Sequence, residues 1–200
     1  MAVYDPVLYK LSRDACILFC KLYCKTTVSG LENIPARGGF IIASNHRSYL
    51  DPVVIGSVCP RRINYMARHD LFSIPIFGRL LRAYGVFPIK RHSADLMALR
   101  EAIRRVNKGF GLLLFPEGTR QTLDRLGEPE AGVGFLAAKI NGPVVPAYIS
   151  GTDKALPKGS RMIRPTRILV KFGRQISIEG GLPYHDIAAR IMRGIGHLAG

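Results

Sequence analysis

The stretch GGFIIASNHRSYLDP, residues 38–52, joins an apolar run to a polar one. Its first part, FIIA, is short, uncharged and preceded by two glycines, which is typical of a buried strand. Its second part contains His46, and Asp51 follows five positions later, directly before Pro52. Because proline is favoured in the first turn of a helix, the stretch predicts a strand, a polar turn and a helix in that order.

The same alternation continues along the chain. Apolar runs bounded by Gly or Pro predict further strands, and segments with helical periodicity lie between them. The expected strands are Phe40–Ala43, Ile63–Ala67, Val86–Ile89, Gly111–Phe115, Val144–Ile149 and Arg167–Phe172. The expected helices are Pro52–Val58, Pro75–Ala83, Ala94–Lys108, Gly132–Ile140 and Ile187–Leu198. This order predicts an α/β fold, a layered αβα domain around a mainly parallel sheet, with sites at the carboxyl ends of strands.

Composition limits the classes of partner. The 200 residues are 48% hydrophobic and 22% charged, which suits a folded domain with a sizeable core. The chain has 29 Lys and Arg against 14 Asp and Glu, a formal net charge of +15, which favours an anionic partner. Nucleic acid is disfavoured, because the basic residues are scattered and no zinc spacing or aromatic RNA-binding block occurs. The spacing of the four cysteines likewise predicts reduced thiols and no metal site.

The N-terminal segment, residues 1–28, is expected to form an amphipathic helix ahead of the α/β domain, which is expected to span residues 29–200. On a helical wheel five of its charged residues fall within one arc: Lys10, Arg13, Asp14, Lys21 and Lys25. Such a helix suits either an anionic membrane surface or packing on the domain. No uncharged run is long enough to cross a bilayer. We therefore expect peripheral or monotopic association with the cytoplasmic side of the cell membrane.

Polar segments follow three of the expected strands. The first contains His46 and Asp51, and a carboxylate next to an imidazole can orient it as a general base. No nucleophile-elbow pattern is present, so such a base would activate the hydroxyl of a bound acceptor. The spacing alone is also compatible with Asp51 capping the following helix and His46 being a hydrogen-bonded strand-end residue.

The segment FPEGTR, residues 115–120, has the residue types of a phosphate and polyol site. Gly118 would let the backbone approach a ligand, and Arg120 offers a planar fork suited to phosphate. Glu117 could orient Arg120 or accept a hydroxyl, although a surface turn with a Glu–Arg pair also fits. Arg91, in the segment GVFPIKRH, would add a second cation at another strand end.

Together these segments resemble the glycerolipid acyltransferases typified by 1-acylglycerol-3-phosphate (lysophosphatidate) acyltransferase. NHRSYLD resembles the NHxSxxD block of that family, and FPEGTR matches its FPEGTR block. GVFPIKR and GPVVPAYI resemble its second and fourth blocks. Two blocks of this length in the right order are a more specific signal than a His and an Asp five positions apart.

The resemblance implies a role for each matching residue. His46 would take the proton from the free hydroxyl of a lysophospholipid, with Asp51 as its orienting partner. The hydroxyl would attack the thioester of acyl-CoA or acyl carrier protein, which acts as the acyl donor, and no further cofactor is implied. The residues implied to hold the acceptor's glycerol-phosphate part are Arg91, Glu117, Gly118, Thr119 and Arg120.

The motifs do not determine which lipid is the acceptor. The second block departs from the family pattern at Pro88 and Lys90. Lysophosphatidate, which would give phosphatidic acid, is the expected acceptor, and another lysolipid or glycerol 3-phosphate is the alternative. A non-catalytic lipid-binding protein of the same fold is the alternative from another functional class.

Overall fold

The structure is a computed structural model that describes residues 6–90, 95–121, 125–140, 142–178 and 181–200. Its strands are β1 (Thr27–Ser29), β2 (Phe40–Ser44), β3 (Ile63–Arg68), β4 (Phe87–Ile89), β5 (Gly111–Leu114), β6 (Val144–Ser150) and β7 (Leu169–Phe172). Its α-helices are α1 (Pro6–Leu22), α2 (Asp51–Val58), α3 (Pro75–Ala83), α4 (Leu96–Asn107), α5 (Ala131–Lys139), α6 (Thr152–Ala155) and α7 (Tyr184–Gly196). Short 3₁₀ helices, η1 (Leu31–Asn33) and η2 (His69–Ser73), complete the described elements.

The described strands form one mostly parallel sheet. Their order is β1-β7-β6-β2-β5-β3-β4, and β6 with β7 is the antiparallel pair among them. The central strand β2 pairs in parallel with β5 on one side and β6 on the other. All five of its residues are buried, as expected for a strand covered on both faces. The expected α/β class with a mainly parallel sheet is therefore confirmed.

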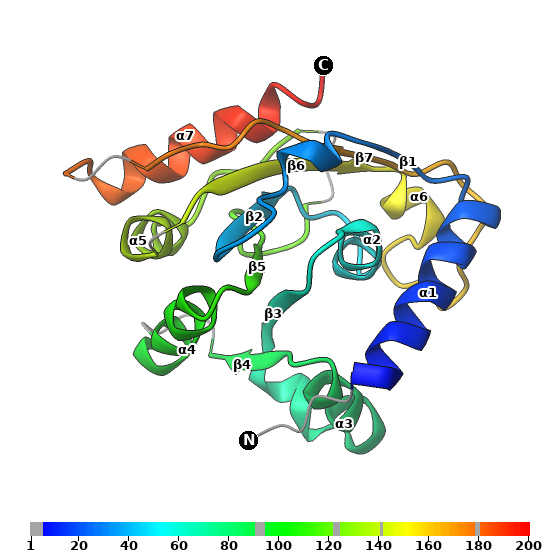
Figure 1. Cartoon of the computed structure of the whole chain (residues 1–200). Helices are drawn as coiled ribbons and strands as arrows, with labels where there is room; N and C mark the ends of the chain where they lie inside the picture. The colour runs from blue at the N-terminus through cyan, green and yellow to red at the C-terminus, as the bar shows by residue number, and fades with distance from the viewer. Residues whose placement is uncertain (1–5, 91–94, 122–124, 141, 179–180) are drawn as a thin grey trace.

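Helices cover both faces of the sheet (Figure 1). One core packs the sheet against α2, α6 and the end of the α1 segment, and the other packs it against α4, α5 and α7. Neighbouring residues of β2 alternate between the two cores, with Ile42 in the first and Ile41 in the second. This alternation follows from the two-residue period of a strand, and it produces the three layers that the sequence predicts.

The expected strands and helices are present, with ends shifted by up to three residues. The sequence prediction missed β1, which is three residues long and pairs in parallel with β7. A short, partly polar segment lacks the apolar run by which strands are identified. β1 also runs across the expected boundary at residue 28, and the division of the chain into two segments stays a prediction.

Helix α1 packs on α2 through one side and leaves another side exposed. Arg13 turns inward, and its guanidinium donates hydrogen bonds to the carbonyls of Ser57 (3.1 Å) and Cys59 (3.0 Å) at the end of α2. It satisfies carbonyls that a helix end leaves unpaired, so Arg13 packs against α2 although the helical wheel groups it with the other charged residues. The exposed side carries apolar side chains: Val7, Leu11, Leu18 and Leu22.

The described part of α1, like the other described helices, is too short or too polar to cross a membrane. Free thiols lie on α1 and just after the ends of α1 and α2: Cys16, Cys20, Cys24 and Cys59. Burial raises the pKa of each of these thiols above its ordinary value. The cysteines are therefore packing residues held in the protonated form.

Arg105 ties helix α4 to the far strands of the sheet. Its guanidinium donates to Asn64 Oδ1 at 2.8 Å and to the Gly85 carbonyl, and it lies 4.5 Å from the centroid of the Phe87 ring. Glu101, one turn earlier, accepts from Arg105 Nε at 2.7 Å and from Arg104. Hydrogen bonds from Arg104 and the charge of Arg105 lower the pKa of the Glu101 carboxyl to about 2.

This pKa makes the stability of the domain depend on pH. The carboxyl of Glu101 has a lower pKa folded, about 2, than its ordinary 4.5, so its stabilisation is present above pH 4.5 and is lost as pH falls toward 2. We expect Glu101→Gln to lower the free energy of unfolding by about 1 kcal/mol at pH 7, because solvent screens a partly exposed pair. Urea unfolding should show that this difference disappears at acid pH, while Glu32→Gln, at an exposed site, has no effect at either pH.

Candidate active site

The sheet register brings two distant loops together. Ala43 in β2 lies opposite Leu114 in β5, so the turns that leave these parallel strands start side by side. The first turn contains residues 45–50 and leads into α2, and the second contains residues 115–121. The carboxyl ends of β2 and β5 therefore carry the NHRSYLD and FPEGTR segments to one place.

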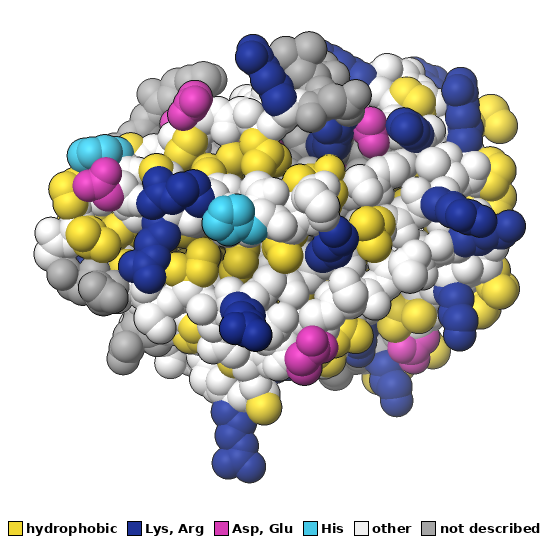
Figure 2. Space-filling view, turned by 90° about the horizontal axis from the view of Figure 1, so that it is seen from above, with side chains coloured by type: hydrophobic (Ala, Val, Ile, Leu, Met, Phe, Trp, Pro, Cys, Tyr) yellow, Lys and Arg dark blue, Asp and Glu magenta, His cyan; other side chains and the backbone are white. Residues whose placement is uncertain are grey.

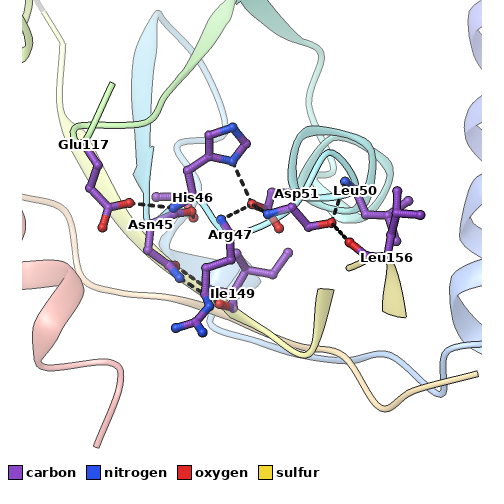
Figure 3. A network of polar contacts seen from close by, with 10 residues as sticks. Asn45, His46, Arg47, Leu50, Asp51, Glu117, Ile149 and Leu156 are labelled. Carbon is purple, nitrogen blue, oxygen red and sulfur yellow. Dashed lines mark hydrogen bonds and ion pairs between the residues drawn. The ribbon is translucent and has the colours of Figure 1, made fainter. Parts of the chain in front are cut away.

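His46 and Asp51 meet through their side chains. His46 Nδ1 lies 2.8 Å from Asp51 Oδ2 (Figure 3). The Asp51 side chain is fully buried, whereas 13% of the His46 side chain is exposed. An ionised carboxylate can only accept a hydrogen bond, so Nδ1 carries the hydrogen. The other ring nitrogen, Nε2, is left as an acceptor. This geometry suits an imidazole that acts as a general base.

Asp51 is not the cap of α2. The N-cap residue is Leu50, and no side chain caps the helix. Asp51 Oδ2 instead accepts hydrogen bonds from the backbone N–H groups of Arg47 (2.6 Å) and Ser48 (2.8 Å), which precede it in the turn. Oδ1 has no hydrogen-bond partner among the described residues. The carboxylate therefore closes the turn around His46, and the helix-cap interpretation is excluded.

Glu117 fixes the backbone of His46. Its side chain is buried, and Oε2 accepts the His46 N–H at 2.8 Å while Oε1 accepts the Gly127 N–H at 2.8 Å. The His46 carbonyl accepts the Gln121 N–H, also at 2.8 Å. Both backbone polar groups of His46 are thus bonded to the FPEGTR loop and its continuation. The expected pairing of Glu117 with Arg120 does not occur among the described contacts, and any substrate contact of Glu117 stays a prediction.

Two further residues support the site, and the sequence analysis assigned them no role. The ring of Phe115 stacks on the His46 imidazole, with centroids 4.0 Å apart and planes 18° from parallel. The Asn45 side chain donates to the Ile149 carbonyl (2.9 Å) and accepts from the Ile149 N–H (2.8 Å). Asn45 therefore extends the pairing of β2 with β6 past the end of the strand (Figure 3). Asn45 is part of the NHRSYLD segment and Phe115 is part of the FPEGTR segment. Their place in these two segments was the only sign in the sequence that they belong to the site.

Gly118, Thr119 and Arg120 form the turn beside His46. Gly118 adopts a left-handed conformation, with φ 64°, and its N–H bonds to the Phe115 carbonyl. The guanidinium of Arg120 lies 3.6 Å from the centroid of the Tyr49 ring, so it sits against the NHRSYLD turn. Among the described residues no carboxylate forms an ion pair with Arg120. The contact of Arg120 with a substrate phosphate stays a prediction.

Arg91, the other expected phosphate contact, lies outside the described residues. The strand that leads to it is β4, and the Lys90 N–H after that strand bonds to Asp95 Oδ2 at 2.9 Å. The structure thus brings together His46 and Asp51, and it places Glu117 and Arg120 against the same turn. In the described part of the chain, no group of three or more His, Cys, Asp or Glu side chains is arranged to hold a metal ion.

The Glu117 bonds can be tested by removing one acceptor oxygen. In Glu117→Gln the amide would face either the His46 or the Gly127 N–H with an N–H of its own, leaving a buried donor unsatisfied. We expect the free energy of unfolding to fall by about 1–3 kcal/mol, measured by urea denaturation. Glu128→Gln, in the same loop and exposed, should unfold like the unmodified chain, and equal stability of the two variants would contradict the role given to Glu117.

Comparisons with known proteins identify the family of this chain. The family model described as Acyltransferase matches residues 25–150. The chain is 35% identical to the 1-acyl-sn-glycerol-3-phosphate acyltransferase BAT2 of Brassica napus chloroplasts over 70% of this chain and 42% of that protein. The 1-acyl-sn-glycerol-3-phosphate acyltransferase of Bacillus subtilis is 30% identical over 78% of each chain.

The chain spans less than half the length of the chloroplastic relatives that it matches, 42% of BAT2 and 47% of LPAT1 from Arabidopsis thaliana. The crystal structure of the 1-acyl-sn-glycerophosphate (LPA) acyltransferase PlsC from Thermotoga maritima superimposes with a TM-score of 0.74 at 26% identity, covering 98% of this chain and 84% of that one. The family model, these relatives and the shared fold show that the chain belongs to the acyltransferase family that includes the 1-acyl-sn-glycerol-3-phosphate acyltransferases.

Proposed function

We propose that this chain transfers a fatty acyl group from acyl-CoA or acyl carrier protein to the free hydroxyl of 1-acylglycerol 3-phosphate. The product would be phosphatidic acid, an intermediate of phospholipid biosynthesis. The observation that carries the proposal is the 2.8 Å contact between His46 and the buried Asp51. Beside it, Arg120 lies against the Tyr49 ring and forms no ion pair with a carboxylate among the described residues. Relatives named as 1-acyl-sn-glycerol-3-phosphate acyltransferases support the choice of acceptor.

In this mechanism the imidazole of His46 moves the proton. Nε2 takes it from the acceptor hydroxyl as the oxygen attacks the thioester carbonyl, and Asp51 stabilises the imidazolium through Nδ1–H. The tetrahedral intermediate then collapses, the carbon–sulfur bond breaks, and the imidazolium returns the proton to the leaving thiolate. The acyl group passes directly from sulfur to oxygen. No acyl-enzyme and no cofactor beyond the thioester donor take part.

Arg120 is assigned to the phosphate of the acceptor. Its guanidinium is held against Tyr49 and has no described carboxylate partner, and a planar fork of donors suits a phosphate. The left-handed turn at Gly118 and the neighbouring Thr119 would bring backbone and hydroxyl groups to the glycerol part. Another lysolipid or glycerol 3-phosphate is the alternative acceptor, because both carry the same phosphate and hydroxyl chemistry.

The acceptor is a membrane lipid, so the enzyme would work at a bilayer surface. The exposed apolar side of α1, next to Lys10 and Lys21, suits contact with an anionic membrane, in a peripheral or monotopic arrangement on the cytoplasmic side. Lys and Arg side chains are spread over the face seen in Figure 2, and do not form one compact cluster there. The formal charge of +15 would attract the protein to an acidic surface over a wide area.

Replacement of His46 tests the base. We expect His46→Ala to lower kcat for acyl transfer from acyl-CoA to lysophosphatidate by about 10²–10⁴-fold, because general-base catalysis contributes that much. Product formation with a radiolabelled acyl donor measures it, with circular dichroism to confirm folding. His185→Ala, at an exposed histidine on α7, should leave kcat unchanged. A folded His46→Ala protein with full activity would refute the mechanism.

Replacement of Arg120 tests the phosphate contact. We expect Arg120→Ala to raise KM for lysophosphatidate by about tenfold or more, since a charge-assisted contact to phosphate contributes roughly 1.5–3 kcal/mol. The KM for the acyl donor should change little. Arg161→Ala, at an exposed arginine, serves as the charge-matched control. An equal rise in KM in both variants would point to general attraction by the basic surface, and would remove Arg120 from the site.

A further inference from the structure

Helix α3 presents its apolar side chains to solvent. Ile76 is 84% exposed, and Ile74, Phe77 and Leu80 are each at least 41% exposed. The one buried residue of the helix is Gly78. A helix at the edge of a domain normally turns its apolar stripe toward the core, so α3 is oriented the opposite way.

The inner side of α3 explains this orientation. A side chain added at Gly78 would lie 2.3 Å from the Phe72 carbonyl oxygen, so the helix approaches η2 backbone to backbone. At ~100° per residue, Ile76, Phe77 and Leu80 fall within about 100° of one another on the side away from Gly78. Close packing through a glycine therefore fixes which side faces out, and the outward side is apolar.

One basic residue, Arg79, borders this apolar surface. Arg79 and Arg82 are both exposed, and α3 contains no Asp or Glu. On the wheel Arg79 lies next to Ile76, at the border of the apolar arc. Arg82 lies nearer the inner side, with its guanidinium 5.5 Å from the centroid of the Phe72 ring in η2. Apolar side chains with an arginine along one border are the pattern of a helix that lies in the plane of an anionic membrane surface.

The position of α3 relates it to the site and to α1. The helix follows β3 and η2, and so begins at the edge of the sheet where the parallel strand β2 delivers His46. Its other end lies beside the first turns of α1, where the rings of Tyr84 and Tyr9 have centroids 6.2 Å apart (Figure 1). The exposed apolar side chains of α1 and α3 therefore belong to neighbouring helices.

We propose that α3 is a membrane-docking helix, whose side chains Ile76, Phe77 and Leu80 enter the headgroup region of an anionic bilayer while Arg79 contacts lipid phosphates. This inference rests on the proposed function only in that the acceptor is a bilayer lipid. A second copy of the chain fits this surface less well, because a twofold contact would bring the arginines of both copies together. Contact through α3 would hold the edge of the sheet that carries His46 at the membrane.

Vesicle binding tests the proposal without any assay of catalysis. The full chain is sedimented with vesicles of equal parts phosphatidylcholine and phosphatidylglycerol, and with phosphatidylcholine alone. We expect Ile76→Ser with Leu80→Ser to weaken binding to the mixed vesicles at least about tenfold, since two exposed apolar side chains lose their insertion. Arg79→Gln should weaken binding to the mixed vesicles and leave binding to phosphatidylcholine unchanged. Met162→Ser with Leu182→Ser, exposed apolar sites away from α3, is the matched control.

The outcomes separate the possible occupants. Unchanged vesicle binding by the Ile76 and Leu80 double variant would overturn the proposal. Sedimentation velocity without vesicles detects the alternative, because a change from dimer to monomer in that variant would identify α3 as a contact between copies and would also overturn it. Vesicle binding that depends on α3, in a protein that transfers no acyl group, would support the docking helix while the proposed function fails.

Discussion

The geometry of the site depends on the carboxylate of Glu117, because it accepts hydrogen bonds from backbone N–H groups of two loops that are far apart in sequence. A buried carboxylate is costly unless hydrogen bonds replace its water, and each oxygen of Glu117 has such a bond. Asp51 repeats the arrangement within a single turn, where Oδ2 binds two backbone N–H groups and the imidazole of His46. The position of His46 is thus set by main-chain bonds to one carboxylate and a side-chain bond to another.

These hydrogen bonds can form because the sheet holds the two loops next to each other. The parallel register of β2 with β5 brings the ends of the two strands level, and the Asn45 side chain continues the pairing with β6 beyond the strand. The ring of Phe115 then closes one side of the imidazole. A histidine held by backbone bonds, a stacked ring and a buried carboxylate would lose little conformational freedom when a substrate binds, and such pre-organisation suits the proposed general base.

The sequence predicts the fold class, the order of the main elements and the two loops of the site, because these depend on apolar periodicity and on local motifs. It does not predict partners that arise only in three dimensions. Glu117 was expected to pair with Arg120 if it did not bind a substrate hydroxyl, yet its carboxylate binds the backbone of His46, since proximity in sequence does not show which loop packs opposite. Arg13 has the helical periodicity of a solvent-facing residue, and only the place where α2 ends shows why it turns inward. β1 is too short to carry a periodic signal at all.

The cysteine cluster between α1 and α2 has a practical consequence for how the N-terminal helix can be observed. Cys20, Cys24 and Cys59 are buried free thiols whose pKa values burial has raised, so they are slow nucleophiles while α1 stays in place. Movement of α1 away from α2 would expose them to water and to reagent at the same time. The native chain therefore contains its own chemical probe of that contact, and the rate at which these thiols are alkylated, with and without lipid, would report how tightly the helix is held.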